Sequence, residues 1–325
     1  MGRQRMGRAG IRMNELSGFH IKRQLGPVNK EKLPEIFNVG RFHIVLIAAL
    51  GMFTFGWLFT GRYLWLLTGI CALDWFIVNL INRATDIKED VAGDIRGTKL
   101  IERYKLTVVG FGIFLLITSL IAYHFVNPAV TGLRIAGHLL GIFYNWPLLP
   151  GRRRLKELYF FKNAASGTGF MITVFGYPLA TQHWGEIPYG FPTGITWGTV
   201  VFSAIFFFLF IQSYEIIYDL RDIKGDALAG IHTYPVAHGE RVAVHIVDGL
   251  IFSSMAVLMV GYLLGEVPWR IVIMAVAPLV QFFVYKRGLK RGISSKDCIL
   301  LTWVGAIMLT IYHLWVVAGL PGSGV

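Results

Sequence analysis

The sequence predicts an all-α integral membrane protein in which nine transmembrane helices are arranged as an internal duplication. Hydrophobic residues account for 54% of the 325 residues and charged residues for only 15%. The chain is therefore far more apolar than an average globular protein. Apolar runs long enough to cross about 30 Å of hydrocarbon recur along the whole chain, which favours helices over the alternating strands of a barrel.

The expected spans follow from these apolar runs, each of which has about the length that a helix needs to cross a bilayer. They cover residues 43–60, 63–83, 105–125, 130–148, 160–180, 197–218, 243–265, 268–286 and 298–319. We expect an N-terminal arm at residues 1–41 and a single transmembrane domain at 42–325. Its pseudo-repeats would cover about 42–180 and 181–325.

The distribution of Lys and Arg predicts the orientation. The N-terminal arm and the connections after the second, fourth, sixth and eighth spans hold 28 of these residues, against three at Arg62, Arg134 and Arg270 on the other side. Because cytoplasmic connections are enriched in Lys and Arg, we expect a cytoplasmic N-terminus and an external C-terminus, in a bacterial inner (plasma) membrane. The net charge of +12 therefore reflects the topology of the chain in the membrane. It favours membrane lipids rather than nucleic acid as partners.

A repeated acidic motif ends two of the apolar segments. Asn82, Asp86 and Asp90 stand four residues apart, so they line one face if the helix continues. The pentapeptide Asp-Ile-Lys-x-Asp from Asp86 to Asp90 recurs 136 residues later, from Asp222 to Asp226. Both copies lie on the expected cytoplasmic side, which suggests that two halves of the protein face each other across one site.

Clustered carboxylates of this kind indicate a divalent cation. Asp94 and Asp219 extend the two clusters, whose like charges would repel one another if left bare. Mg²⁺ takes oxygen ligands and is typically held by one or two carboxylates plus substrate phosphate oxygens. Two clusters at one mouth suit two Mg²⁺ ions bridging a diphosphate. The alternative is a charged, solvated loop in which Lys88 and Lys224 are the partners of the aspartates.

Basic residues between the fourth and fifth spans are candidate phosphate contacts. Arg154 and Lys156 lie in a basic run, and Lys162 and Asn163 open the fifth span. A positive group near a helix N-terminus is well placed to meet an anion. The alternative is the ordinary enrichment of basic residues on the cytoplasmic side.

Some polar residues lie deeper in the apolar spans, where an ionisable side chain is costly and usually faces a cavity or the bundle interior. Asp74 lies two turns before Asn82, and Glu215 lies one turn before Asp219, with Tyr218 nearby. They could line a pocket and orient an acceptor or take its proton. Asp74 could equally be a satisfied structural carboxyl.

These motifs resemble those of the UbiA superfamily of intramembrane prenyltransferases. Asn82–Asp90 matches the pattern N-x-x-x-D-x-x-x-D, and Asp222–Asp226 matches D-x-x-x-D. Leu155–Asn163 is similar to the L-K-x-x-x-x-x-K-N segment of many members. Gly230–Gly239 resembles the G-x-x-(S/T)-x-x-V-x-x-G continuation found in chlorophyll synthase and related members. One departure is Arg83, at a position that is often acidic in the family.

The resemblance implies a bundle around a central cavity, two Mg²⁺ ions, and an isoprenyl diphosphate whose tail enters the cavity. The implied catalytic residues are Asp86, Asp90, Asp222, Asp226 and Lys156, the four aspartates also being the metal ligands. The implied substrate-binding residues are Asn82, Arg83, Tyr144, Arg154, Lys162, Asn163, Tyr218 and Asp219.

The expected activity is Mg²⁺-dependent transfer of an isoprenyl group from a polyprenyl diphosphate to an aromatic or lipid acceptor. Mg²⁺ and Lys would neutralise the leaving diphosphate, and an aromatic membrane cavity would keep the carbocation from water. Other possibilities within the superfamily are a terpene cyclase and a phosphoribosyltransferase acting on polyprenyl phosphate. A transporter is the alternative of another class, because internal repeats and charged half-sites are also typical of transporters.

Overall fold

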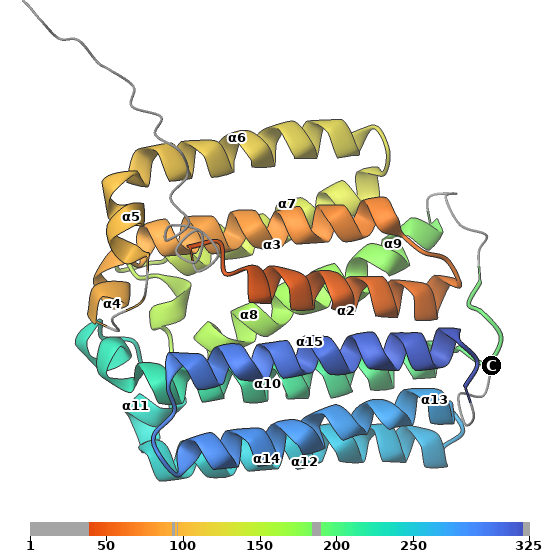
Figure 1. The fold of residues 1–325 in the computed structure, drawn as a ribbon. Helices are drawn as coiled ribbons and strands as arrows, with labels where there is room; N and C mark the ends of the chain where they lie inside the picture. Colours follow the sequence, from red (N-terminus) through yellow and green to blue (C-terminus); the bar gives the residue numbers. More distant parts are fainter. Residues whose placement is uncertain (1–38, 93–94, 96, 184–189, 321–325) are drawn as a thin grey trace, which may run out of the picture.

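The structure, a computed structural model, describes residues 39–92, 95, 97–183 and 190–320. Within these ranges the chain is helical, and the only β-type pairing is an isolated bridge between Leu149 and Arg153. The long helices lie side by side as a bundle, with the short helices α4 and α11 at one end (Figure 1).

The helical segments are α2 (Phe42–Thr60), α3 (Trp65–Thr85), α4 (Ile87–Ala92), α5 (Thr98–Arg103), α6 (Lys105–His124), α7 (Pro128–Asn145), the 3₁₀ turn η1 (Leu155–Glu157), α8 (Phe161–Met171), the π turn η2 (Ile172–Gly176), α9 (Tyr177–His183), α10 (Trp197–Leu228), α11 (Tyr234–His238), α12 (Glu240–Leu263), α13 (Trp269–Val272), the 3₁₀ turn η3 (Ile273–Ala275), α14 (Val276–Leu289) and α15 (Ser295–Val317).

Seven of the described helical segments are long and apolar enough to cross a membrane: α2, α3, α6, α10, α12, α13 to α14, and α15. The prediction of an all-helical membrane protein is therefore confirmed. The other two predicted spans are also helical, in α7 and in α8 to α9, but their composition and regularity differ. Arg134 and His138 lie inside α7, and the π turn η2 precedes Pro178, which has no backbone N–H to continue the helical bonding.

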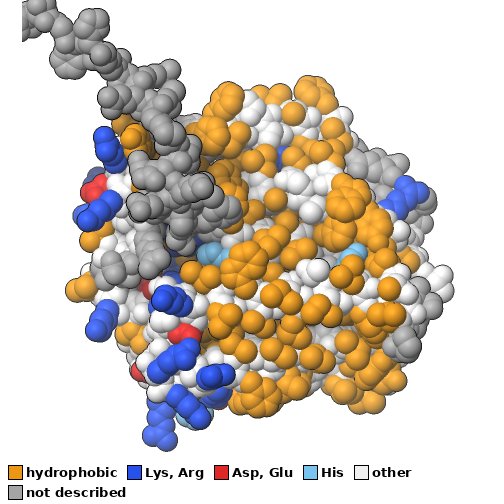
Figure 2. All heavy atoms as spheres, viewed as in Figure 1, with side chains coloured by type: hydrophobic (Ala, Val, Ile, Leu, Met, Phe, Trp, Pro, Cys, Tyr) orange, Lys and Arg blue, Asp and Glu red, His pale blue; other side chains and the backbone are white. Residues whose placement is uncertain are grey.

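The surface divides into an apolar side and a charged end. In Figure 2 most Lys, Arg, Asp and Glu side chains gather at the end that carries α4 and α11, whereas the face along the helices is mostly hydrophobic. We call the charged end, which contains Asp86 and Asp222, the aspartate end, and the opposite one the far end. An apolar belt with charges at its end is the surface that a bilayer requires.

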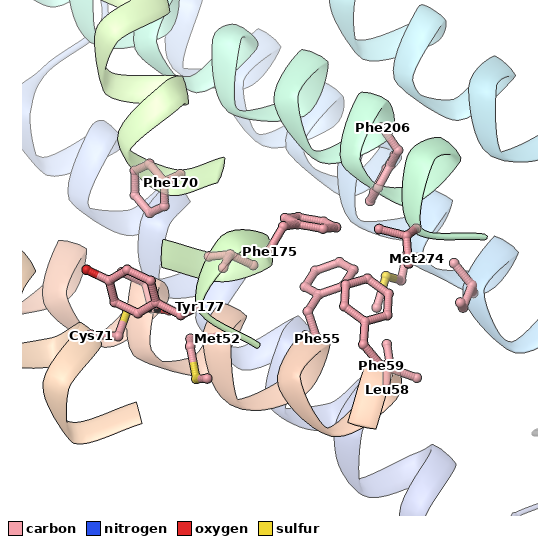
Figure 3. Close-up of a cluster of buried hydrophobic side chains, with 14 of the residues drawn as sticks. Met52, Phe55, Leu58, Phe59, Cys71, Phe170, Phe175, Tyr177, Phe206 and Met274 are labelled. Atoms are coloured by element: carbon pink, nitrogen blue, oxygen red, sulfur yellow. Dashed lines mark hydrogen bonds between the residues drawn. The ribbon is translucent and has the colours of Figure 1, made fainter. Parts of the chain in front are cut away.

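An aromatic cluster packs the far half of the bundle. Phe55 and Phe59 of α2 meet Phe175 of η2, with ring centroids 4.8 and 5.4 Å apart, and all three side chains are buried. Figure 3 shows them beside Phe206 and Met274. Because α2 is apolar on every side, it can be buried in the bundle on one face and exposed to lipid on another.

One sequence prediction about topology is wrong. Arg134 was assigned to a connection outside the membrane, but it lies within α7 and is fully buried. Its guanidinium is bound by Asp74 of α3, so burial of the charge is compensated inside the bundle. Arg134 therefore carries no information about which side of the membrane a connection occupies.

Candidate active site

The first acidic motif lies at a break between two helices. Helix α3 ends at Thr85, and Asp86 has φ −97° and ψ 23°, so the helix does not continue without a break through Asp90. The backbone hydrogen bonds nevertheless continue across the break, from Asp86 N to Asn82 O at 3.0 Å and from Asp90 N to Asp86 O at 2.8 Å. Because these hydrogen bonds join residues four positions apart, Asn82, Asp86 and Asp90 stay one helical turn apart in spite of the break.

The second motif lies within one long helix, α10, which extends ten residues beyond the predicted end of its span at residue 218. Asp219 and Asp226 are seven residues apart and therefore share a face. The ammonium of Lys162 joins them, at 2.8 Å from Asp219 Oδ1 and 2.7 Å from Asp226 Oδ2. Asp222 is more exposed, and its carboxylate accepts from its neighbour Arg221, with Nε 2.7 Å from Oδ1.

The two motifs lie against each other. A methyl group at Gly225 of α10 would stand 3.7 Å from the carbonyl oxygen of Glu89 in α4. The two motif-bearing segments therefore lie close together at this point, with room for a methyl group in ordinary contact. Residues 136 positions apart in sequence meet at the aspartate end, as the duplicated pattern suggested.

The connection between α7 and α8 places basic side chains on the first motif. Paired hydrogen bonds between Leu149 and Arg153 and the turn η1 fold this connection tightly. Lys156, which is buried, donates to Asp86 and lies 3.7 Å from Glu89. Arg154 Nη1 lies 2.9 Å from Glu89 Oε1. Although burial opposes ionisation, Lys156 and Arg154 hold the pKa of Glu89 below its ordinary value.

Arg83 is the binding partner of Asp90. Its guanidinium is fully buried and donates to the Asp90 carboxylate, and Arg41 approaches the same carboxylate at 3.9 Å. Burial raises the pKa of Asp90 above its ordinary value, although Arg41 and Arg83 favour its charged form. Arg83, the departure from the family pattern, therefore balances the negative charge of Asp90, a candidate metal ligand.

Three further predicted residues, Asn163, Tyr144 and Tyr218, lie beside Asp219 or on the wall of the central cavity. Asn163 Nδ2 donates to Asp219 Oδ2 at 2.8 Å, in agreement with its position at the start of α8. The ring of Tyr144 is 5.8 Å from Lys156 Nζ, on the wall of the central cavity. Tyr218 also lines the cavity, but its hydroxyl is engaged by Thr302 Oγ1 at 2.9 Å.

The donor atoms at this end are suited to a hard cation. Among the described residues, no three Asp, Glu, His or Cys side chains converge closely enough to form a ready metal site, and Asp94 lies outside those residues. The available donors are carboxylate and amide oxygens. Oδ1 of Asn82 is buried and has no hydrogen-bond partner among the described residues. An orphaned oxygen beside Asp86 fits the oxygen preference of Mg²⁺.

A cavity of about 610 Å³ opens beside the first motif and continues into the bundle. Asn82 and Tyr144 line its entrance together with Ser166 and Glu215, which are joined by a 2.7 Å hydrogen bond. Deeper walls are aromatic and include Trp75, Phe170, Phe206, Phe207 and Phe210. A polar mouth above an apolar interior suits a ligand with a charged head and a hydrocarbon tail.

Several site residues were not predicted. Arg41, Glu89 and Asn145 contribute to the aspartate end, Asn145 through a 3.1 Å hydrogen bond from Thr85 Oγ1. Glu89 lies inside the first motif and could have been found as its third carboxylate. Arg41 and Asn145 carry no local signal, because their partners are distant in the sequence.

The sequence matches the UbiA prenyltransferase family over residues 42–311. The chain belongs to the UbiA prenyltransferase family. Within this family it is 36% identical over 61 residues to a digeranylgeranylglyceryl phosphate synthase of Methanopyrus kandleri. That stretch covers 19% of this chain and 22% of the relative.

Solved structures of UbiA proteins share the fold of this family member. A UbiA homolog of Archaeoglobus fulgidus bound to DMAPP and Mg²⁺ superimposes with a TM-score of 0.63 at 15% identity, over 88% of this chain and 100% of the homolog. Its complex with GPP and Mg²⁺ has the same TM-score and identity, over 87% and 99% of the chains. A digeranylgeranylglyceryl phosphate synthase gives 0.52 at 18% identity, over 87% and 96%.

Proposed function

We propose that this UbiA family member transfers an isoprenyl group from an isoprenyl diphosphate to a lipophilic or aromatic acceptor inside the membrane, with Mg²⁺ as cofactor. The observation that carries the proposal is that the two acidic motifs lie against each other at one end of a mostly apolar cavity, which is lined by Asn82 of the first motif and by Tyr218, one turn before the second. Similarity to digeranylgeranylglyceryl phosphate synthases favours a lipid acceptor over an aromatic one.

The acidic motifs would hold the cofactor through their oxygen atoms. Asn82, Asp86 and Asp90 are the donors of the first motif, and Asp222 and Asp226 those of the second. Two motifs favour two ions, each completed by phosphate oxygens of the donor. When bound, Mg²⁺ supplies positive charge that stabilises the departing diphosphate.

Basic side chains would hold the diphosphate beside these ligands. Lys156 and Lys162 contact carboxylates of the first and second motifs respectively, so each is within reach of a phosphate bound there. Arg83 and Arg154 add positive charge at the first motif. In this partly buried setting, charge stabilisation is stronger than in water, which favours loss of diphosphate from the allylic carbon.

The cavity would protect the reactive carbon. Trp75, Phe170 and Phe210 present ring faces and edges to the interior, where they exclude water and can stabilise a positive carbon. Glu215, Tyr144 and Ser166 offer hydrogen-bonding groups on the cavity wall, and Ser166 is hydrogen-bonded to Glu215 rather than to a motif carboxylate. We assign the acceptor to this cluster.

The membrane arrangement is part of the proposal. We infer that α7 and the α8 to α9 segment also cross the bilayer, which completes nine spans with the N-terminus in the cytoplasm and the C-terminus outside. The pentapeptide Asp-Ile-Lys-x-Asp directly follows α3 and recurs near the end of α10, which supports two pseudo-repeats at about 42–180 and 181–325. The aspartate end would then face the cytoplasm.

The experiment is product analysis with purified protein in lipid nanodiscs. Radiolabelled geranyl or geranylgeranyl diphosphate is supplied with Mg²⁺ and a total lipid extract, and products are identified by mass spectrometry. We expect a new prenylated lipid that disappears with EDTA and returns with added Mg²⁺. A cyclised hydrocarbon made without any acceptor would instead favour a terpene cyclase.

A further inference from the structure

The cavity has a measurable depth along three of its walls. Its lining extends over residues 206–218 of α10, 302–315 of α15 and 44–55 of α2. At 1.5 Å of rise per helical residue, these ranges correspond to about 18, 20 and 17 Å. The three helices therefore give a depth of nearly 20 Å, on the order of the length of a short lipid tail.

The upper limits of these ranges lie at the aspartate end. The hydroxyl of Tyr218 is 2.9 Å from Thr302 Oγ1, which puts the starts of the α10 and α15 walls at one level. Arg41 is 3.9 Å from Asp90, which ties the α2 wall to the first motif. The depth is therefore measured from the place where the diphosphate is proposed to bind.

The far end of the cavity is closed by large side chains. Phe55, Phe206, Met274 and Trp315 line it there and form what we call the floor. Figure 3 shows the first three beside one another. Behind the floor the interior is filled by buried residues that do not line the cavity, namely Phe59, Val200, Ile271, Val272 and Val316.

We propose that this floor limits the length of the isoprenyl tail, and that the preferred donor is a diphosphate of four isoprene units, geranylgeranyl diphosphate. One unit adds four chain bonds and about 5 Å when extended, somewhat more than the 3.8 Å of a peptide repeat. About four units therefore fill a depth of about 20 Å. The inference rests on the proposed function, because it takes the tail to enter from the aspartate end.

A fifth unit would have to displace the floor. Phe55 and Phe206 are almost completely buried, at 1% and 3% exposure, and the side chains behind them are buried as well, so a longer chain that continued in the same direction would have to displace them. Close-packed interiors do not yield such space cheaply. Shorter tails fit but leave the aromatic floor without contacts.

The test is competition for Mg²⁺-dependent binding of labelled geranylgeranyl diphosphate by unlabelled prenyl diphosphates of one to ten units in mixed micelles. We expect binding to tighten from one to four units and to weaken at least tenfold at five units and beyond. Phe206→Ala should remove most of the penalty at five units, and Met274→Ala should do so independently if the first variant folds poorly.

A matched control is Phe208→Ala on the same helix. Phe208 does not line the cavity and packs instead against Gly167 of α8. The Phe208→Ala variant should prefer the same length of prenyl diphosphate as the wild type. Equal binding of four-unit and nine-unit donors would overturn the length limit while leaving the prenyltransferase assignment intact. Failure of folded protein to bind a prenyl diphosphate of any length would defeat the proposed function as well.

Discussion

Arg134 and Asp74 form a bidentate ion pair inside the bundle, with Nε 2.9 Å from Oδ2 and Nη2 2.8 Å from Oδ1. The carboxylate of Asp74 also binds His138 at 2.9 Å and accepts from Tyr177 at 2.8 Å, and Arg134 donates to Ser119. This network joins α3, α6, α7 and α9. Asp74 is thus a satisfied carboxyl, and together with Arg134 and His138 it also lines the cavity, so both of the positions that the sequence allowed for it are occupied.

Replacing Arg134 with Met should destabilise the protein by about 3 to 5 kcal/mol, because it leaves the buried Asp74 carboxylate without its cation. The measurement is thermal or denaturant unfolding in detergent. The double variant Arg134→Met with Asp74→Leu should recover much of the loss, since neither charge then remains buried. A single variant as stable as the wild type would show that the pair does not hold the helices together.

Asp86→Asn and Asp226→Asn should each reduce prenyl transfer at least a hundredfold, by removing a charged oxygen ligand from either motif. Initial rates at saturating donor and several Mg²⁺ concentrations measure the effect. The control is Asp248→Asn, whose carboxylate pairs with Lys286 away from the cavity and should leave the rate within twofold. Full activity in either motif variant would contradict the metal assignment.

Lys162→Met should lower kcat/KM for the donor by about 30- to 1000-fold, a loss of about 2 to 4 kcal/mol of charge stabilisation. The reason is that Lys162 neutralises Asp219 and Asp226 and is proposed to contact the diphosphate. Lys162→Arg should retain part of the activity. Lys224→Met removes an exposed lysine of the second motif and serves as control. Equal losses at positions 162 and 224 would point to a general charge effect.

Gly225 provides a test of the contact between the motifs. Gly225→Ala should be tolerated, because its methyl group would stand at an ordinary 3.7 Å from the Glu89 carbonyl oxygen. Gly225→Leu should push α4 away from α10 and reduce activity at least tenfold, with a smaller effect on unfolding. The measurement is prenyl transfer as a function of Mg²⁺ concentration, compared between the two variants. An active Leu variant with an unchanged curve would mean that the motifs act independently.

Parts of the site could be predicted because their signals are local. The spacing of Asn82, Asp86 and Asp90 and its repetition at Asp222 and Asp226 identified the acidic motifs. Lys162 and Asn163 were correctly expected at the start of a helix. The break at Asp86 was not predicted, because the segment from Ile87 to Ala92 contains no Gly or Pro that would indicate it.

By itself the sequence determined the class of protein, the positions of its apolar helices and the identity of its acidic motifs, since hydropathy and residue spacing are properties of short segments. The tertiary structure decided which cation faces each carboxylate, that Arg134 is internal, and how deep the cavity reaches. Many of these contacts join helices that are far apart in the sequence, such as the pair of Arg134 and Asp74, which are 60 residues apart. Burial and pairing energies of that kind arise only when distant segments meet.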